Sequence, residues 1–275
     1  MKVRWAWLLL SAVGGLLFGF LLLPLVALLF SATGAELWQG LTDSRVQAAL
    51  RLSAITTTVS LVVIVVLGTP LAWVVAASER APARWIEAVL KLPIVVPPAV
   101  AGVALLLAFG RQGYVSRLLR LDSGLAFTSV AVVMAEVFVA APFYLQGAIA
   151  AFRSIDEGIL LAARSVGAGP FRNLIRIAVP IAGPSLLAAA ATSWARALGE
   201  FGATLMFAGN MAGRTQTVPL AIYSALEVDV HTAVALGVLL LGIAIGVLLV
   251  SHFLAWPGRH ASNRRGQRLS RGRKV

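Results

Sequence analysis

Residues 177–207 read IAVPIAGPSLLAAAATSWARALGEFGATLMF, an apolar stretch whose only charged side chains are Arg196 and Glu200. About 20 mostly apolar residues in a helix are enough to cross the hydrocarbon core of a bilayer. Charges are costly in that core, and residues four positions apart lie on one helix face. The stretch therefore predicts a membrane-spanning helix that carries a local ion pair toward one of its ends.

The composition of the whole chain also indicates a membrane protein. Of its 275 residues, 59% are hydrophobic and 12% are charged, whereas soluble domains are about 45–50% apolar and about 25% charged. The chain has no cysteine, and its three histidines are too scattered to suggest a metal site. The phosphate-binding pattern Gly-x-x-x-x-Gly-Lys-Ser/Thr is absent from the sequence. We therefore predict no cofactor in this chain, and any transport against a gradient needs an ion or a partner.

Six apolar runs are long enough to span a bilayer. They occupy residues 5–30, 52–78, 92–110, 125–152, 177–207 and 230–256. The first run is longer than the core of a signal peptide, which is about 7–15 residues, so we interpret it as an uncleaved helix. We predict an all-α polytopic membrane protein with no soluble domain. Residues 1–258 would form the membrane domain and residues 259–275 a basic tail.

The distribution of lysine and arginine predicts the orientation of these helices. With the N-terminus inside, the inner segments hold 16 of the 23 basic residues and the outer segments hold 6, with Arg196 in a span. Both termini are therefore expected in the cytoplasm, and the protein in an inner membrane. The tail 259–275 holds seven basic residues and no aromatic residue, so we assign the net charge of +12 to anionic lipid and not to nucleic acid. The outer loop 111–124 is amphipathic and is expected on the outer surface.

A long inner loop, residues 153–180, contains the sequence IDEGILLAARSVGAGPFRNLIRIAVP at positions 155–180. Ser154 is a candidate N-cap, and two acidic residues after it complement the helix dipole. Apolar residues then recur at helical spacing until Gly167 and the Gly-Pro pair at 169–170 end the helix. A second helix is expected from residue 171 to 180. The pattern predicts a short amphipathic helix, a sharp turn and a return to the membrane, although an ordinary interfacial helix has the same pattern.

This loop resembles the coupling loop of ABC importer permeases, which reads Glu-Ala-Ala, three residues, Gly, nine residues, Ile-x-Leu-Pro. The corresponding positions here are Leu161, Ala162, Ala163, Gly167, Ile177 and Pro180. Leu161 stands where the family has glutamate, which calls one salt bridge to the ATPase into question but leaves the docking of the helix intact. The resemblance implies that this helix sits in a cleft of a separate cytoplasmic ATPase dimer, which uses the ATP.

Three other segments resemble molybdate permeases, a branch of that family. They are residues 91–113, 135–152 and 196–226, and the last is similar in looser form to sulfate and tungstate permeases. The resemblance implies the type I ABC importer permease fold, a homodimer, and an external binding protein that delivers the oxyanion. It implies molybdate as the substrate, with sulfate, thiosulfate or tungstate as alternatives. No catalytic residue is expected in this chain.

A dianion that crosses a low-dielectric region needs hydrogen-bond donors along its path. The candidates are small or polar residues in the central runs, and they are Glu136, Thr192, Ser193, Arg196, Gly199, Glu200, Gly202 and Thr204. Close helix packing accounts for the small residues equally well. Arg196 and Glu200 either anchor a helix end or form an outer gate. Glu136 lies about 11 residues into its run, and it is paired with a cation such as Arg196, or a neutral hydrogen-bonded acid, or a proton site.

Two other classes stay open at this level. A secondary transporter driven by an ion gradient could use Glu136 as its proton site. It would usually be built from inverted repeats, which the two halves do not show, and it would give the inner loop no role. A membrane-embedded enzyme requires clustered His, Asp or Glu residues in one leaflet, and the sequence has no such cluster.

Overall fold

The computed structural model of the chain describes residues 2–78, 80–120, 124–165 and 167–255, and these residues form helices without strands. The long helices are α1 (Lys2–Phe30), α3 (Ser44–Ala76), α6 (Pro98–Phe109), α8 (Ser129–Arg153), α11 (Val179–Leu198) and α14 (Val230–Ala255). The short helices are α2 (Gly34–Thr42), α4 (Ala81–Leu90), α5 (Leu92–Val95), α7 (Tyr114–Leu118), α9 (Glu157–Ser165), α10 (Pro170–Asn173), α12 (Gly202–Ala208) and α13 (Val218–Leu226). Six segments of the described chain are long and apolar enough to cross a membrane, which confirms the predicted number. The predicted basic tail, residues 259–275, lies outside the described residues.

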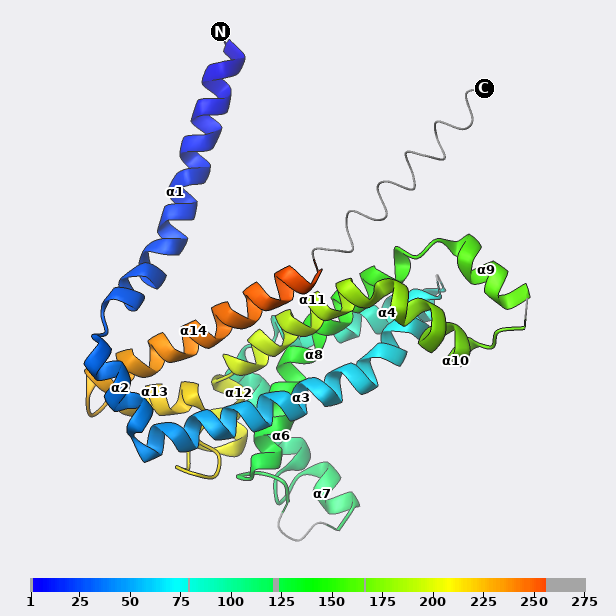
Figure 1. Cartoon of the computed structure of the whole chain (residues 1–275). Helices are drawn as coiled ribbons and strands as arrows, with labels where there is room; N and C mark the ends of the chain where they lie inside the picture. Colours follow the sequence, from blue (N-terminus) through cyan, green and yellow to red (C-terminus); the bar gives the residue numbers. More distant parts are fainter. Residues whose placement is uncertain (1, 79, 121–123, 166, 256–275) are drawn as a thin grey trace.

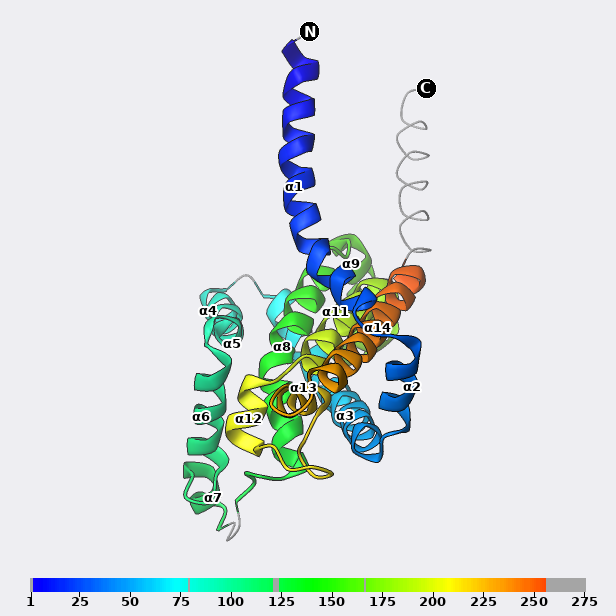
Figure 2. The ribbon, with the colours of Figure 1, turned by 90° about the vertical axis from the view of Figure 1, so that its left-hand side faces the viewer.

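Helix α8 is the centre of the bundle (Figure 1). It packs against α3 and α11 along a core that includes Tyr144, Trp73 and Phe152, and the rings of the last two meet edge to face at 5.4 Å. A second core joins α8 to α6 and α12, and a third joins α3 to α13 and α14. Helices α6 and α12 lie toward one edge of the bundle, and α2 and α14 toward the opposite edge (Figure 2).

The short helices lie at the two ends of the bundle. Helices α4, α9 and α10 gather at one end, and α2 and α13 lie at the other (Figure 1). Helix α1 extends away from the bundle and packs mainly against α14. Its large apolar side chains from Leu10 to Phe30 are mostly exposed in the single chain. An apolar helix of this kind needs lipid or another protein surface around it.

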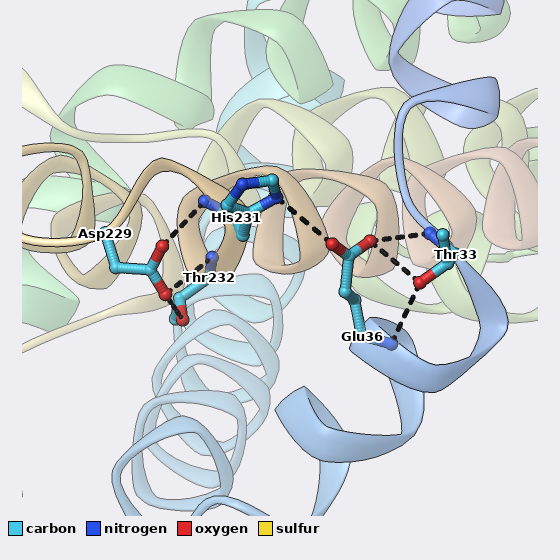
Figure 3. Close-up of polar contacts among 5 residues, drawn as sticks. All are labelled: Thr33, Glu36, Asp229, His231 and Thr232. Atoms are coloured by element: carbon cyan, nitrogen blue, oxygen red, sulfur yellow. Dashed lines mark hydrogen bonds and ion pairs between the residues drawn. The ribbon is translucent and has the colours of Figure 1, made fainter.

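A polar contact links α2 to the start of α14. The Glu36 carboxylate accepts a hydrogen bond from the backbone N–H of Thr33 at 2.7 Å and lies 3.1 Å from Nδ1 of His231 (Figure 3). The bond from the Thr33 backbone holds the pKa of Glu36 below its ordinary value. Asp229, the residue just before α14, accepts hydrogen bonds from the backbone N–H groups of His231 and Thr232. Each carboxylate therefore caps the first turn of a helix at the same end of the bundle.

The third and fourth spans begin later than the sequence predicts. The predicted third run starts at Leu92, but α5 ends at Val95 and α6 begins only at Pro98. Val96 and Pro97 are extended because each precedes a proline, which disfavours helical backbone. The predicted fourth run starts at residue 125, whereas α8 begins at Ser129 and its N-cap, Thr128, accepts a hydrogen bond from the Ala131 N–H at 3.2 Å. A polar cap therefore sets this helix start.

Candidate coupling loop and outer helix break

The inner loop folds into the short helix α9 and a sharp turn, but its N-cap differs from the predicted one. Ser154 is the C-cap of α8, and its hydroxyl donates to the Ala151 carbonyl at 2.7 Å. Asp156 caps α9 instead, because its Oδ1 accepts from the Gly158 N–H at 2.7 Å. Ile155 between the two caps is buried. The connection between α8 and α9 is therefore only three residues long, Ser154 to Asp156, and its apolar residue, Ile155, is anchored in the core.

Some residues of the matched motif on α9 are exposed and others are buried. Leu161 and Ala162 are exposed, whereas Ala163 is buried and its carbonyl accepts from the Ala168 N–H at 3.0 Å. Gly167 has φ +82°, in the left-handed region that favours glycine. Val166 lies outside the described residues. The turn thus depends on a glycine at position 167, and the exposed side of α9 is free for a partner in the single chain.

The second helix of the loop runs into the fifth span without a break. Helix α10 is followed by a π-helical turn, Leu174–Ala178, and then by α11. Pro180 and Pro184 near the start of α11 have no N–H to donate. Single π turns are rare and often mark functional sites. Ile177 lies in the π turn, and Pro180 is exposed. The matched motif therefore runs from the exposed face of α9 to the irregular start of the fifth membrane-spanning helix.

A cavity of about 740 Å³ lies beside this loop, between α9, α4 and the inner ends of α3 and α8. Its lining combines apolar and charged side chains, among them Trp73, Arg84, Glu87, Phe152, Arg153, Ile155, Glu157, Leu160, Leu161 and Arg164. Glu87 is 2.8 Å from Arg153 and 3.0 Å from Lys91. The hydrogen bond from Arg153, followed by that from Lys91, holds the pKa of Glu87 below its usual value. This ion cluster fixes α4 against the inner end of α8.

At the other end of the bundle, the fifth span stops before the predicted run does. The apolar run extends to Phe207, but α11 ends at Leu198 and α12 begins at Gly202. Glu200, only 2% exposed, lies in the break. One of its oxygens accepts from the Ala203 N–H at 2.8 Å, and the other is 2.7 Å from the Arg196 guanidinium. The carboxylate therefore caps α12 and pairs with the last turn of α11, as the four-residue spacing predicts.

The break places α12 against α6 with little space between them. A Cβ on Gly202 would lie 2.7 Å from Cβ of Pro98, and a Cβ on Gly102 would lie 2.6 Å from Cβ of Met206. Gly202 is therefore a packing position, which is one of its two predicted roles. On the open side of the break, Gly199 is exposed and the Arg196 side chain is 27% exposed. This side chain is the cation that an approaching anion could reach.

Glu136 does not pair with Arg196, one of the predicted possibilities. Its carboxyl group accepts hydrogen bonds from Thr56 at 2.8 Å and from Ser60 at 2.7 Å, both on α3. All three side chains are buried, and no ion pair to Glu136 occurs within the described residues. Because α8 starts at Ser129, Glu136 lies about two turns from its N-terminal end and not near its middle. The arrangement matches the hydrogen-bonded acid, the second of the possibilities.

The hydroxyl groups that hold Glu136 belong to a polar stripe that sequence reasoning missed. Ser53, Thr56, Thr57 and Ser60 follow one another at spacings of three, one and three residues and are all buried. These spacings put them on one face of α3, which is the signal that could have revealed them. Ser53 accepts from the Val218 N–H at 2.8 Å. The stripe thus connects α3 to α8 and to α13.

The remaining candidates divide between packing and exposed positions. Ser193 is buried and donates to the Ala140 carbonyl at 2.8 Å, which ties α11 to α8. Thr204 is buried, and its hydroxyl has no hydrogen-bond partner among the described residues. Thr192 is exposed and donates to the Ala188 carbonyl of its own helix. In the described part of the chain, no group of three His, Asp or Glu residues could hold a metal ion.

Six candidate spans, a short loop helix between two of them and a broken helix with a paired cation are together consistent with a membrane permease. Residues 68–256 match the model of the family described as binding-protein-dependent transport system inner membrane component, and the chain belongs to this family. It is therefore a multi-pass inner-membrane protein, as predicted.

Individual relatives give a finer comparison. The chain is 38% identical over 244 residues to the molybdenum transport system permease protein ModB of Mycobacterium tuberculosis. This alignment covers 88% of this chain and 92% of the relative. The chain is 33% identical over 241 residues to the probable transport system permease protein NifC of Clostridium pasteurianum, over 87% of this chain and 84% of the relative. The predicted resemblance to molybdate permeases is thus confirmed over most of the chain.

Solved structures support the fold. A bacterial ABC transporter that imports the acidic polysaccharide alginate matches with a TM-score of 0.70 at 17% identity, over 92% of this chain and 96% of the other. The MetNI methionine ABC transporter, in an inward-facing form, matches with a TM-score of 0.60 at 18% identity, over 75% of this chain and 93% of the other. The chain therefore has the type I ABC importer permease fold.

Proposed function

We propose that the chain is the membrane-spanning subunit of an ATP-driven importer that carries molybdate into the cell. The observation that carries the proposal is the 38% identity to a molybdenum permease over 88% of this chain. The chain itself would hydrolyse nothing. ATP would be used by a separate cytoplasmic ATPase dimer that docks on the loop 153–180, through the exposed face of α9.

The proposed complex also contains a second copy of the chain and an external binding protein. The exposed residues of α11 include the small or hydroxylated Ser185, Ala188 and Thr192 as well as the apolar Ile181 and Leu187, and the exposed Gly199 follows as its C-cap. Hydroxyls and small residues suit close helix contact or a water-lined path better than they suit lipid. A homodimer would bring two such faces together around one path, with both termini in the cytoplasm and the binding protein docked at the outer end.

The path would pass the break between α11 and α12. A dianion that leaves water needs cations or N–H donors in its place. Arg196 is partly exposed and Gly199 is exposed at the break, and both would line the path or its gate. Glu200 and Gly202 would fix the shape of the break through the contacts that they make with Ala203 and Pro98. Glu136 and Thr204 are buried within the chain and would support the path without facing the anion.

The test is uptake of radiolabelled molybdate into vesicles that contain the permease, its ATPase and its binding protein. ATP-dependent accumulation of molybdate is expected, with unlabelled tungstate competing and sulfate competing at least about tenfold less well. Vesicles loaded with a non-hydrolysable ATP analogue are the control. Preferential accumulation of sulfate, or uptake driven by a proton gradient without ATP, would contradict the proposal.

A further inference from the structure

The lining of the cavity beside α9 contains apolar as well as charged side chains. Trp73 and Phe152, which meet edge to face, line it together with Leu160 and Leu161 from α9. Leu161 is 59% exposed. Together with Trp73, Phe152 and Leu160, Leu161 gives the cavity an apolar part that suits an apolar group of a partner. This cavity lies at the end of the bundle where α4, α9 and α10 gather (Figure 1).

Only some of the charged side chains around the cavity have an ion-pair partner among the described residues. Arg153 is already paired with Glu87, which Lys91 also contacts. Arg84 on α4 and Arg164 on α9 line the same cavity, and neither has an ion-pair partner in the described residues. Among the described residues, the other acid in the lining is Glu157, which lies in the first turn of α9, where the helix dipole favours a negative charge. Two cations are therefore left to interact with a partner.

Arg164 combines with the exposed Leu161 in one part of the cavity lining. Arg164 lies three residues after Leu161, so the two side chains are neighbours on one helix face, and both line the cavity. Leu161 therefore presents an apolar side chain to the cavity, and the charge next to it is positive.

We propose that the cavity between α4 and α9 receives an acidic segment of the partner ATPase, seated on Leu161 and held by Arg164 and Arg84. The permease would then contribute the cations of this contact and the ATPase the carboxylates. The inference rests on the proposed function, because it assumes that an ATPase docks on α9. It adds the charge of the partner surface and makes α4 part of the docking site.

The test measures the affinity of the purified, co-expressed ATPase subunit for the permease in nanodiscs of zwitterionic lipid. Arg164→Glu is expected to raise the Kd at least about tenfold, because a like charge then meets the acidic segment. Leu161→Glu places an acid where the acidic segment would sit and is expected to weaken binding at least about fivefold relative to Leu161→Gln, which has the same shape without the charge. If Leu161→Glu binds as well as Leu161→Gln, or more tightly, the partner surface is not acidic and the proposal is wrong.

Two controls separate this result from other causes. Arg80→Glu makes the same charge change on an exposed residue just before α4 that does not line the cavity, and its Kd is expected to stay within about threefold of the wild type. An effect of Arg164→Glu that appears only in nanodiscs with anionic lipid would mean that the arginine recognises lipid, which overturns the proposal. If the wild-type permease binds no ATPase at all, the proposed function fails instead.

Discussion

Glu200 carries out two structural tasks with one carboxylate, and substitutions can separate them. Its removal in Glu200→Ala leaves the buried Ala203 N–H without its acceptor and the partly exposed Arg196 guanidinium without its carboxylate. We expect this variant to lose about 2–4 kcal/mol of stability. Glu200→Gln keeps one oxygen for the Ala203 N–H but replaces the oxygen that faces Arg196 with an NH2 group, so it loses the ion pair and keeps the cap. Its melting temperature in detergent should therefore fall less. Equal melting temperatures for the two variants would show that the cap of α12 contributes nothing.

Glu136 presents a different case, because hydroxyl groups hold it and no cation does. In Glu136→Gln the amide can accept from one hydroxyl and donate to the other, whose own hydrogen can turn to the carbonyl of Ser53 at 3.4 Å or of Val133 at 3.3 Å. Uptake by this variant is expected within about twofold of the wild type. Glu136→Ala leaves Thr56 and Ser60 without their acceptor and opens a cavity, at a cost of about 2–4 kcal/mol. A glutamine variant that folds normally but does not transport would instead support a proton role for Glu136.

At the scale of elements, the contact between α6 and α12 depends on glycine. A methyl group at Gly102 would meet Cβ of Met206 at 2.6 Å and the Ala203 carbonyl at 2.8 Å, and that carbonyl belongs to the backbone. We expect Gly102→Ala to destabilise the protein by about 1–3 kcal/mol as α12 is pushed away. Gly242→Ala is the matched control on α14, where nothing lies within 4 Å of the added methyl group. A melting temperature that is lower for Gly242→Ala than for Gly102→Ala would contradict the close packing of α6 and α12.

The elements also show which parts of the fold a sequence can predict. Six long apolar runs identify six spans because the bilayer sets their length, and this number is correct. The ends of the helices depend instead on single polar contacts. Asp156 and not Ser154 caps α9, and Glu200 ends an apolar run that composition alone would continue to Phe207. Partners that are distant in sequence, such as Glu136 and Ser60, require the helices to be placed first.

At the scale of the whole molecule, no contact within the chain fixes its orientation in the membrane. The excess of basic residues in alternate loops predicts that α9 faces the cytoplasm and that the loop before α7 faces outward. Because the chain contains no cysteine, single cysteines can report on each side without background labelling. Ser165 on α9 and Gln112 before α7 are both exposed. In intact spheroplasts, a membrane-impermeant maleimide should label Gln112→Cys, and it should label Ser165→Cys only after the membrane is opened. The reverse pattern would invert the topology, and it would remove the cytoplasmic ATPase from reach of the loop on which the proposed coupling depends.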